Sequence, residues 1–170
     1  MAIDSATNVL MQSIENSVLT SFSKIIAIIT DPLILLITSL IIAAILYLKK
    51  RNKQATLLAT TTIATAILIK LSKQIIQRAR PLNALVQEIS SAFPSGHTTM
   101  AVVFFGLIAY LFITKKQKLA AIITTLIILL IAFTRIYLRV HWLTDVIAGV
   151  ILGTIILAIS ITIHKKSNSF

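Results

Sequence analysis

Two histidines stand among polar residues in a pattern that suits nucleophilic or acid–base chemistry. His97 follows Ser95 and Gly96 where a polar stretch meets a long apolar run, and His141 precedes Asp145 by four residues. This spacing predicts that His141 and Asp145 lie on one face of the last helix. An Asp that accepts from one imidazole nitrogen fixes the tautomer and leaves the other nitrogen free to attack. These residues therefore predict nucleophilic or acid–base chemistry.

Basic residues at three places in the chain are the candidate anion-binding groups. Lys73, Arg80 and Arg135 can donate to phosphate without a proton transfer, and arginine can do so with two N–H groups. The Ser95 hydroxyl and the Gly96 backbone can also approach an oxyanion, at a helix start with unpaired N–H groups. Each feature also has a purely structural interpretation, because basic residues at helix ends often extend toward the membrane interface.

The composition predicts an all-α integral membrane protein with a single domain over residues 1–170. The chain is 57% hydrophobic and only 12% charged, which leaves too few polar residues for a water-soluble surface. In so apolar a chain we expect the net charge of +11 to reflect topology and contact with membrane lipids, and we expect no nucleic-acid partner. No cysteine is present, which excludes thiol catalysis and thiolate metal sites. Residues 1–15 predict no cleavable signal peptide.

We predict a bundle of five to six transmembrane helices. Five apolar segments are each long enough to cross a hydrocarbon core of about 30 Å: residues 32–48, 55–71, 98–114, 119–134 and 141–163. Residues 8–30 alternate apolar and polar side chains at helical spacing, which favours an amphipathic helix in the membrane interface. A polar-lined first span is the alternative for this segment. Gly149 and Gly153 predict close packing of the last span against a neighbour.

The distribution of basic residues predicts the orientation. Alternating spans place three basic clusters on the same side: Lys49 to Lys53, Lys115 to Lys118, and Lys165 with Lys166. The positive-inside rule assigns that side to the cytoplasm, so we expect a multi-pass plasma-membrane protein. The polar stretches with the candidate site residues then face the extracytoplasmic side.

Together these residues resemble the three-part signature of the type 2 phosphatidic acid phosphatase superfamily. The matching segments are Lys73…Arg80-Pro81, Pro94-Ser95-Gly96-His97 and Arg135…His141…Asp145. One position departs from the usual pattern, because Thr134 stands where the family usually has Ser, but a hydroxyl is kept. Three motifs in the family's order weigh far more than any one of them.

The resemblance implies a role for each residue. His141 would be the nucleophile that forms a phosphohistidine, Asp145 would orient it, and His97 would protonate the leaving oxygen and later assist the water. The phosphoryl oxygens would be held by the remaining motif residues: Lys73, Arg80, Ser95, the Gly96 amide and Arg135. The chemistry of the family needs no metal and no cofactor, so we expect neither here.

The resemblance also implies a lipid phosphate or diphosphate as substrate. A short chain with an interfacial N-terminal helix is similar to small polyprenyl-diphosphate phosphatases, so an undecaprenyl or dolichyl diphosphate is the first expectation. Phosphatidic acid or phosphatidylglycerol phosphate is the alternative within the family. An anion or lipid transporter and a non-catalytic lipid-binding scaffold are alternatives of other classes, although no inverted repeat is evident. The sequence predicts no oligomeric state.

Overall fold

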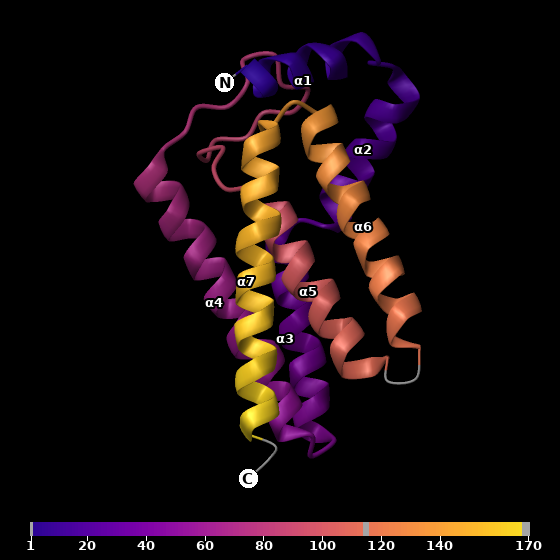
Figure 1. Cartoon of the computed structure of the whole chain (residues 1–170), viewed down its shortest axis with the longest axis vertical. Coiled ribbons are helices and arrows are strands. Elements are labelled where there is room, and N and C mark those ends of the chain that lie inside the picture. The colour runs from indigo at the N-terminus through magenta and orange to yellow at the C-terminus, as the bar shows by residue number, and fades with distance from the viewer. Residues whose placement is uncertain (1, 114–115, 168–170) are drawn as a thin grey trace.

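The computed structural model describes residues 2–113 and 116–167, and these form seven helices without any strand. The all-α prediction is therefore confirmed. Helices α3 to α7 run roughly along the long axis of the molecule, and α1 lies across their upper end (Figure 1). The helices are α1 (Ala2–Ser13), α2 (Ser17–Ile29), α3 (Pro32–Leu48), α4 (Asn52–Ile76), α5 (Gly96–Phe112), α6 (Gln117–Tyr137) and α7 (Leu143–Ser167).

Several of these helices are apolar and long enough to cross a membrane. By length and composition α4, α6 and α7 qualify alone, and α2 with α3 forms a fourth candidate that is bent by 41°. Helix α5 is a shorter apolar helix of 17 residues. The protein is thus a multi-pass membrane protein, with three to four spans by the length and composition of its helices. The predicted count of five to six spans stays a prediction.

The predicted boundaries need correction at most helix ends. Only the span at 32–48 coincides with a helix, α3. Helices α4 and α6 exceed 55–71 and 119–134 at both ends because their terminal turns are polar, and hydropathy detects only the apolar part. Helix α5 begins at Gly96 and ends at Phe112, and residue 114 lies outside the described residues. Helix α7 begins at Leu143 rather than at 141 because the Asp145 carboxylate accepts the Trp142 N–H and so caps the helix there.

The single amphipathic helix predicted for residues 8–30 is wrong. Helix α1 ends at Ser13, and α2 begins at Ser17 after a sharp corner (Figure 1). Asn16 causes the new start because its side chain accepts the Leu19 N–H at 2.8 Å, as a helix N-cap does. The Asn16 N–H donates to the Tyr137 hydroxyl at 3.0 Å, which fixes the corner against α6.

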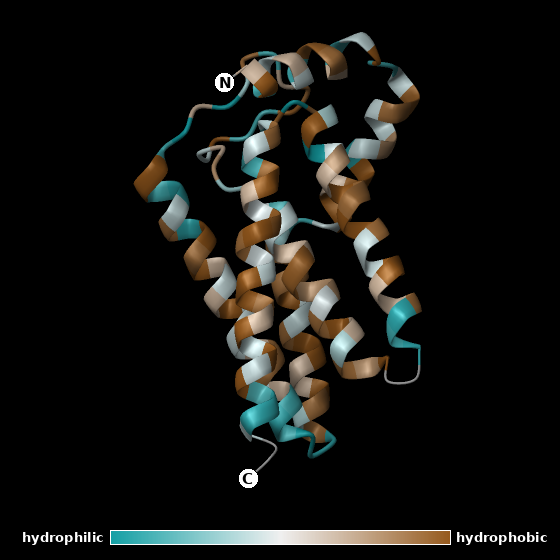
Figure 2. Cartoon of the chain, viewed as in Figure 1, coloured by the Kyte–Doolittle hydropathy of each residue, from teal (hydrophilic) through white to brown (hydrophobic). Residues whose placement is uncertain are grey.

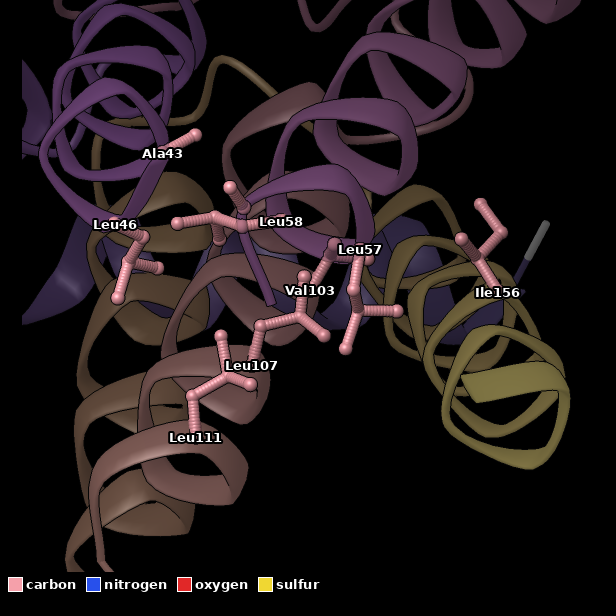
Figure 3. Packing of buried hydrophobic residues seen from close by; sticks show 9 residues of the cluster. Ala43, Leu46, Leu57, Leu58, Val103, Leu107, Leu111 and Ile156 are labelled. Atoms are coloured by element: carbon pink, nitrogen blue, oxygen red, sulfur yellow. The ribbon is translucent and has the colours of Figure 1, made fainter. Parts of the chain in front are cut away.

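Helix α5 is the central helix of the bundle. It packs against α3, α4, α6 and α7, and every residue from Gly96 to Phe104 is buried. A helix that is apolar on all sides is expected in such a position. Figure 3 shows the apolar cluster at its lower half, where α5 meets α3, α4 and α7; its labelled members are Ala43, Leu46, Leu57, Leu58, Val103, Leu107, Leu111 and Ile156.

The two ends of the bundle differ in charge. The α3–α4 connection and the carboxyl end of α7 lie at the lower end and are strongly hydrophilic (Figure 2). The described residues of the three basic clusters thus share one end, as alternating spans predict, while Lys115 lies outside the described residues. The α4–α5 connection (residues 77–95) and the α6–α7 connection lie at the opposite end with α1 (Figure 1).

Glycines bring α5 and α7 into close contact, as the sequence predicted. A Cβ on Gly149 would lie 2.9 Å from the Ser95 carbonyl oxygen. A Cβ on Gly153 would lie 2.8 Å from Val102 Cβ and 2.9 Å from the Thr99 carbonyl oxygen. None of these three atoms is the movable end of a side chain, so any larger residue at Gly149 or Gly153 would push the two helices apart.

Gly153→Ala should therefore lower the thermal stability of the purified protein in detergent. Overpacking of this kind costs about 1–3 kcal/mol. Gly106→Ala is the matched control, because the nearest atoms that its methyl meets all belong to the flexible side chain of Leu157. Thermal unfolding followed by circular dichroism measures both variants. Equal melting temperatures for Gly153→Ala and the wild type would contradict the close contact.

Candidate active site

All the predicted site residues lie where the helices meet the 77–95 connection and the α6–α7 connection. Four helix ends and the two connections supply them: Lys73 from the last turn of α4, Arg80 from the 77–95 connection, Ser95, Gly96 and His97 from the start of α5, Arg135 from the last turn of α6, His141 from the α6–α7 connection, and Asp145 from the first turn of α7. The connection folds back over this end, so residues far apart in sequence come together.

The ring of His141 is buried and has a defined tautomer. Its Nδ1 lies 2.7 Å from the Ala92 carbonyl oxygen, which can only accept, so Nδ1 carries the proton. The other nitrogen, Nε2, bears a lone pair and lies 3.4 Å from Nη1 of Arg80. Asp145 is farther away, with 3.8 Å between its Oδ2 and Nδ1 of His141. The Ala92 carbonyl therefore sets the tautomer, a role that the sequence had assigned to Asp145.

The expectation that His141 lies on the last helix is also wrong. His141 is two residues before the first residue of α7, in the turn that leads into the helix. The pairing with Asp145 persists because the turn keeps the two side chains near each other. Burial lowers the pKa of His141 to about 4; Asp145 opposes this shift, and Arg80 and Arg135 add to it. The imidazole is therefore neutral near pH 7 and able to act as a nucleophile.

Two arginines of the signature share one carboxylate. Glu88 Oε2 lies 2.8 Å from Nη2 of Arg80, and Glu88 Oε1 pairs with Nη2 of Arg135. Arg135 is only 2% exposed, and its Nε has no hydrogen-bond partner among the described residues. Lys73 Nζ donates to the Ser91 carbonyl oxygen. The 77–95 connection thus supplies oxygen atoms, from Glu88 and Ser91, to the N–H groups of Arg80, Arg135 and Lys73. An external anion would bind to the same N–H groups.

The start of α5 links two parts of the signature. The Ser95 N–H donates to the Asp145 carbonyl oxygen at 3.0 Å, which joins α5 to the first turn of α7. The Ser95 hydroxyl lies 3.0 Å from that of Thr98 and, within the described chain, makes no capping bond to the helix. Gly96 lies beside Lys73, since a Cβ on it would be 3.9 Å from Lys73 Cε. The end of the Lys73 side chain thus lies beside the first residue of α5.

His97 lies on the same side of the bundle, buried between α2 and the 77–95 connection. Its Nε2 lies 3.1 Å from the Ala27 carbonyl oxygen, so Nε2 carries a proton and donates a hydrogen bond to this carbonyl near the end of α2. His97 borders the same cavity as His141. The structure therefore brings both histidines to one space.

Two cavities meet at the site. The larger, about 630 Å³, includes Lys73, Gly96, His97 and His141 in its wall and extends between α3 and α4. A second cavity of about 390 Å³ lies between α2 and α6 and includes Arg135. His97, Glu88 and Asp31 border both cavities. The larger cavity combines apolar walls with a few convergent polar groups, as ligand sites usually do.

Sequence reasoning missed the acidic and basic partners of the signature. Arg78 is no fixed position of the three motifs, yet it bonds both Asp145 and Asp4. Glu88 belongs to no motif either, yet it bridges Arg80 and Arg135. The scarcity of acidic residues is a signal that could have identified Glu88 and Asp4. The chain has only five Asp and Glu against sixteen Lys and Arg, so each acidic residue is a candidate ion-pair partner.

Comparison with known proteins supports the resemblance. Over 97 residues the chain is 40% identical to phosphatidylglycerophosphatase B of Bacillus subtilis (strain 168), covering 53% of this chain and 48% of that protein. Over 130 residues it is 28% identical to undecaprenyl-diphosphatase of Sulfolobus acidocaldarius, covering 72% of this chain and 61% of that protein. The chain thus spans about half to three fifths of the length of these relatives.

A solved structure is similar over nearly the whole chain. It is a transmembrane PAP2 type phosphatidylglycerolphosphate phosphatase from Bacillus subtilis, with a TM-score of 0.87 and 29% identity, covering 97% of this chain and 87% of that one. The family model described as PAP2 superfamily matches residues 54–169, which include every part of the three-part signature. This match extends over more than half of the sequence, and the protein therefore belongs to the PAP2 superfamily.

Proposed function

We propose that the protein is a membrane lipid phosphatase that hydrolyses a lipid phosphate through a phosphohistidine. The observation that carries this proposal is that a neutral, buried His141 shares an apolar-walled cavity with Lys73 and has Arg80 beside its Nε2. Phosphoryl transfer mainly requires positioning of the reactants and stabilisation of charge, which such an arrangement supplies. Membership of the PAP2 superfamily supports the same conclusion.

The proposed reaction has two steps. Nε2 of His141 attacks phosphorus and the bond to the lipid oxygen breaks, while His97, protonated at Nδ1 when the substrate is bound, gives that proton to the leaving oxygen and keeps its Nε2 proton on the Ala27 carbonyl. Water then attacks the phosphohistidine, His97 takes a proton from the water, and the N–P bond breaks to release phosphate. Arg80 is placed to hold a phosphoryl oxygen next to Nε2, and Lys73 and Arg135 would hold the others, with the Ser95 hydroxyl and the Gly96 amide. Asp145 stabilises the cationic ring during the transfer.

A lipid is the substrate class that fits the larger cavity. Beside its cationic groups the cavity has an apolar wall between α3 and α4, formed by Pro32, Leu33, Ala66 and Ile69. A headgroup could bind at the cations while the chain stays between these helices. The sequence favoured a polyprenyl diphosphate, whereas the similarity over nearly the whole chain is to a phosphatidylglycerolphosphate phosphatase. We therefore place phosphatidylglycerol phosphate first and a polyprenyl diphosphate second.

The purified protein should release phosphate from phosphatidylglycerol phosphate in the presence of EDTA, and vanadate should inhibit the release. His141→Ala should abolish turnover because it removes the proposed nucleophile. Phosphate release across a panel that includes phosphatidic acid and undecaprenyl diphosphate ranks the substrates. An unchanged rate in a folded His141→Ala variant would contradict the mechanism. Anion flux into liposomes that survives this substitution, without any hydrolysis, would instead favour a transporter.

Glu88→Gln should tighten the binding of vanadate several-fold. The Glu88 carboxylate now bridges Arg80 and Arg135, so an incoming anion must replace it, and the amide competes less strongly. Inhibition constants for vanadate measure the effect. Glu15→Gln is the control, because Glu15 pairs with Arg139 instead. Weaker vanadate binding in Glu88→Gln would mean that the carboxylate organises the arginines and does not compete with the anion.

We also propose five crossings, α3 to α7, with the active site on the extracytoplasmic side. The chain has no cysteine, so single cysteines can report the side of each connection. Cysteine at the fully exposed Leu82 should react with an impermeant maleimide in intact cells, whereas cysteine at the exposed Lys166 should react only after permeabilisation. The proposal places three crossings, α5 to α7, between these two positions. Labelling of both positions from outside would exclude an odd number of crossings between them, and the reverse pattern would invert the orientation.

A further inference from the structure

Asp4 is a buried carboxylate far in sequence from the three-part signature. It lies in the first turn of α1, is 4% exposed, and accepts hydrogen bonds from only two residues of the described chain. Its Oδ2 lies 2.7 Å from Nη2 of Arg78, and its Oδ1 lies 3.0 Å from the Thr144 N–H. The Thr144 hydroxyl also donates to it. Burial alone would raise the pKa of Asp4, but these bonds outweigh it and lower the pKa, so the carboxylate is ionised.

Asp4 completes the start of α7. The residue before this helix is Trp142, whose side chain has no acceptor for the first-turn N–H groups. Asp4 supplies the missing acceptor from another helix by bonding the Thr144 N–H. Asp145 provides the second half of the cap, because its Oδ2 accepts the Trp142 N–H at 2.9 Å. Both carboxylates therefore accept backbone N–H groups at the start of α7, Asp4 from another helix and Asp145 from α7 itself.

Arg78 connects the two carboxylates. Its Nη1 donates to Asp145 Oδ1 and its Nη2 to Asp4 Oδ2. Nη1 also lies 2.7 Å from the Thr144 hydroxyl, and the guanidinium lies over the Trp142 ring at 5.8 Å. Asp145 is fully buried, so Arg78 is the counter-cation that makes its ionised form tolerable there. Two carboxylates and one guanidinium leave the group with a net charge of −1.

We propose that Asp4 and Arg78 are positioning residues that set the orientation of Asp145 and, through it, the basicity of His141. The N-terminal helix α1 would thus belong to the active site without touching the substrate. The inference rests on the proposed function, in which His141 is the nucleophile. It also explains why α1 is held across the end of the bundle by its buried Asp4.

The charges around His141 predict opposite effects for the two partners. Besides Asp145, the charged groups that face the ring are Arg80, Arg135 and Glu88. Asp4→Asn leaves Arg78 to neutralise Asp145 fully, so the imidazolium loses stabilisation and the pKa of His141 should fall. Arg78→Gln leaves two carboxylates without their cation, so the pKa of His141 should rise. Arg78→Lys keeps the charge and should stay near the wild type.

The test measures Asp4→Asn, Arg78→Gln and Arg78→Lys with Glu15→Gln as the matched control. Glu15→Gln also breaks an ion pair of the N-terminal segment, between Glu15 and Arg139, but it does not contact Asp145. Phosphate release should show kcat lowered on the order of tenfold or more in Asp4→Asn and Arg78→Gln, with KM little changed. The pKa of His141 is followed by NMR of the histidine ring in detergent micelles, assigned with His141→Gln.

Opposite shifts of the His141 pKa in Asp4→Asn and Arg78→Gln, with Arg78→Lys close to the wild type, would establish the proposal. Unchanged pKa values in folded variants would overturn it, and so would a loss of kcat in Glu15→Gln equal to that in Asp4→Asn. The NMR titration does not depend on turnover. A wild-type protein that hydrolyses no lipid phosphate would therefore refute the proposed function and leave the coupling between Asp4, Arg78 and His141 measurable.

Discussion

The structure depends on the pairing of carboxylates with guanidinium groups at the end of an apolar bundle, where Asp145 is buried and Glu88 is half-buried. An ion that loses its partner in such a place is left with an uncompensated desolvation cost of several kcal/mol. Glu88 pairs with Arg80 and Arg135, and Asp145 pairs with Arg78. Because these partners come from the 77–95 connection and from two helices, α6 and α7, ion pairing determines how the connection folds over the helix ends.

Helix packing supplies the second constraint. Gly149 and Gly153 let α7 approach α5 so closely that the Ser95 N–H bonds the Asp145 carbonyl oxygen. This bond joins the start of α5, with Ser95, Gly96 and His97, to the turn that carries His141. The distance between the two motifs is therefore set by the contact of two rigid helices, with the backbone of one bonded to the backbone of the other.

The same arrangement relates binding to catalysis. The cations that would hold a phosphate are already satisfied by Glu88 and by carbonyl groups of the connection. Under the proposed function, substrate binding would exchange one set of oxygen atoms for another, so the site need not keep a cluster of unpaired charges. The lone pair on Nε2 of His141 lies beside Arg80, one of these cations. It is free because the Ala92 carbonyl holds the ring proton on the other nitrogen.

Much of this protein could be read from the sequence, for local reasons. Apolar runs of about 15–23 residues predict helices regardless of context, since the backbone must satisfy its own hydrogen bonds in lipid. The three motifs identified the candidate site residues because the type and spacing of residues are chemical properties of the chain. The family followed from the same residues, and the match to residues 54–169 confirms it.

Only the tertiary structure decided how these residues are supported. Tyr137 fixes the corner at Asn16, Asp4 bonds the first turn of α7, and the Ala92 carbonyl sets the tautomer of His141, so each of these features depends on a contact between distant segments. Asp4 and Arg78 belong to no motif, and the sequence does not show that one carboxylate of α1 meets α7. Types and spacing of residues thus determined the chemistry, whereas the pairing of charges and the approach of α5 to α7 decided its geometry.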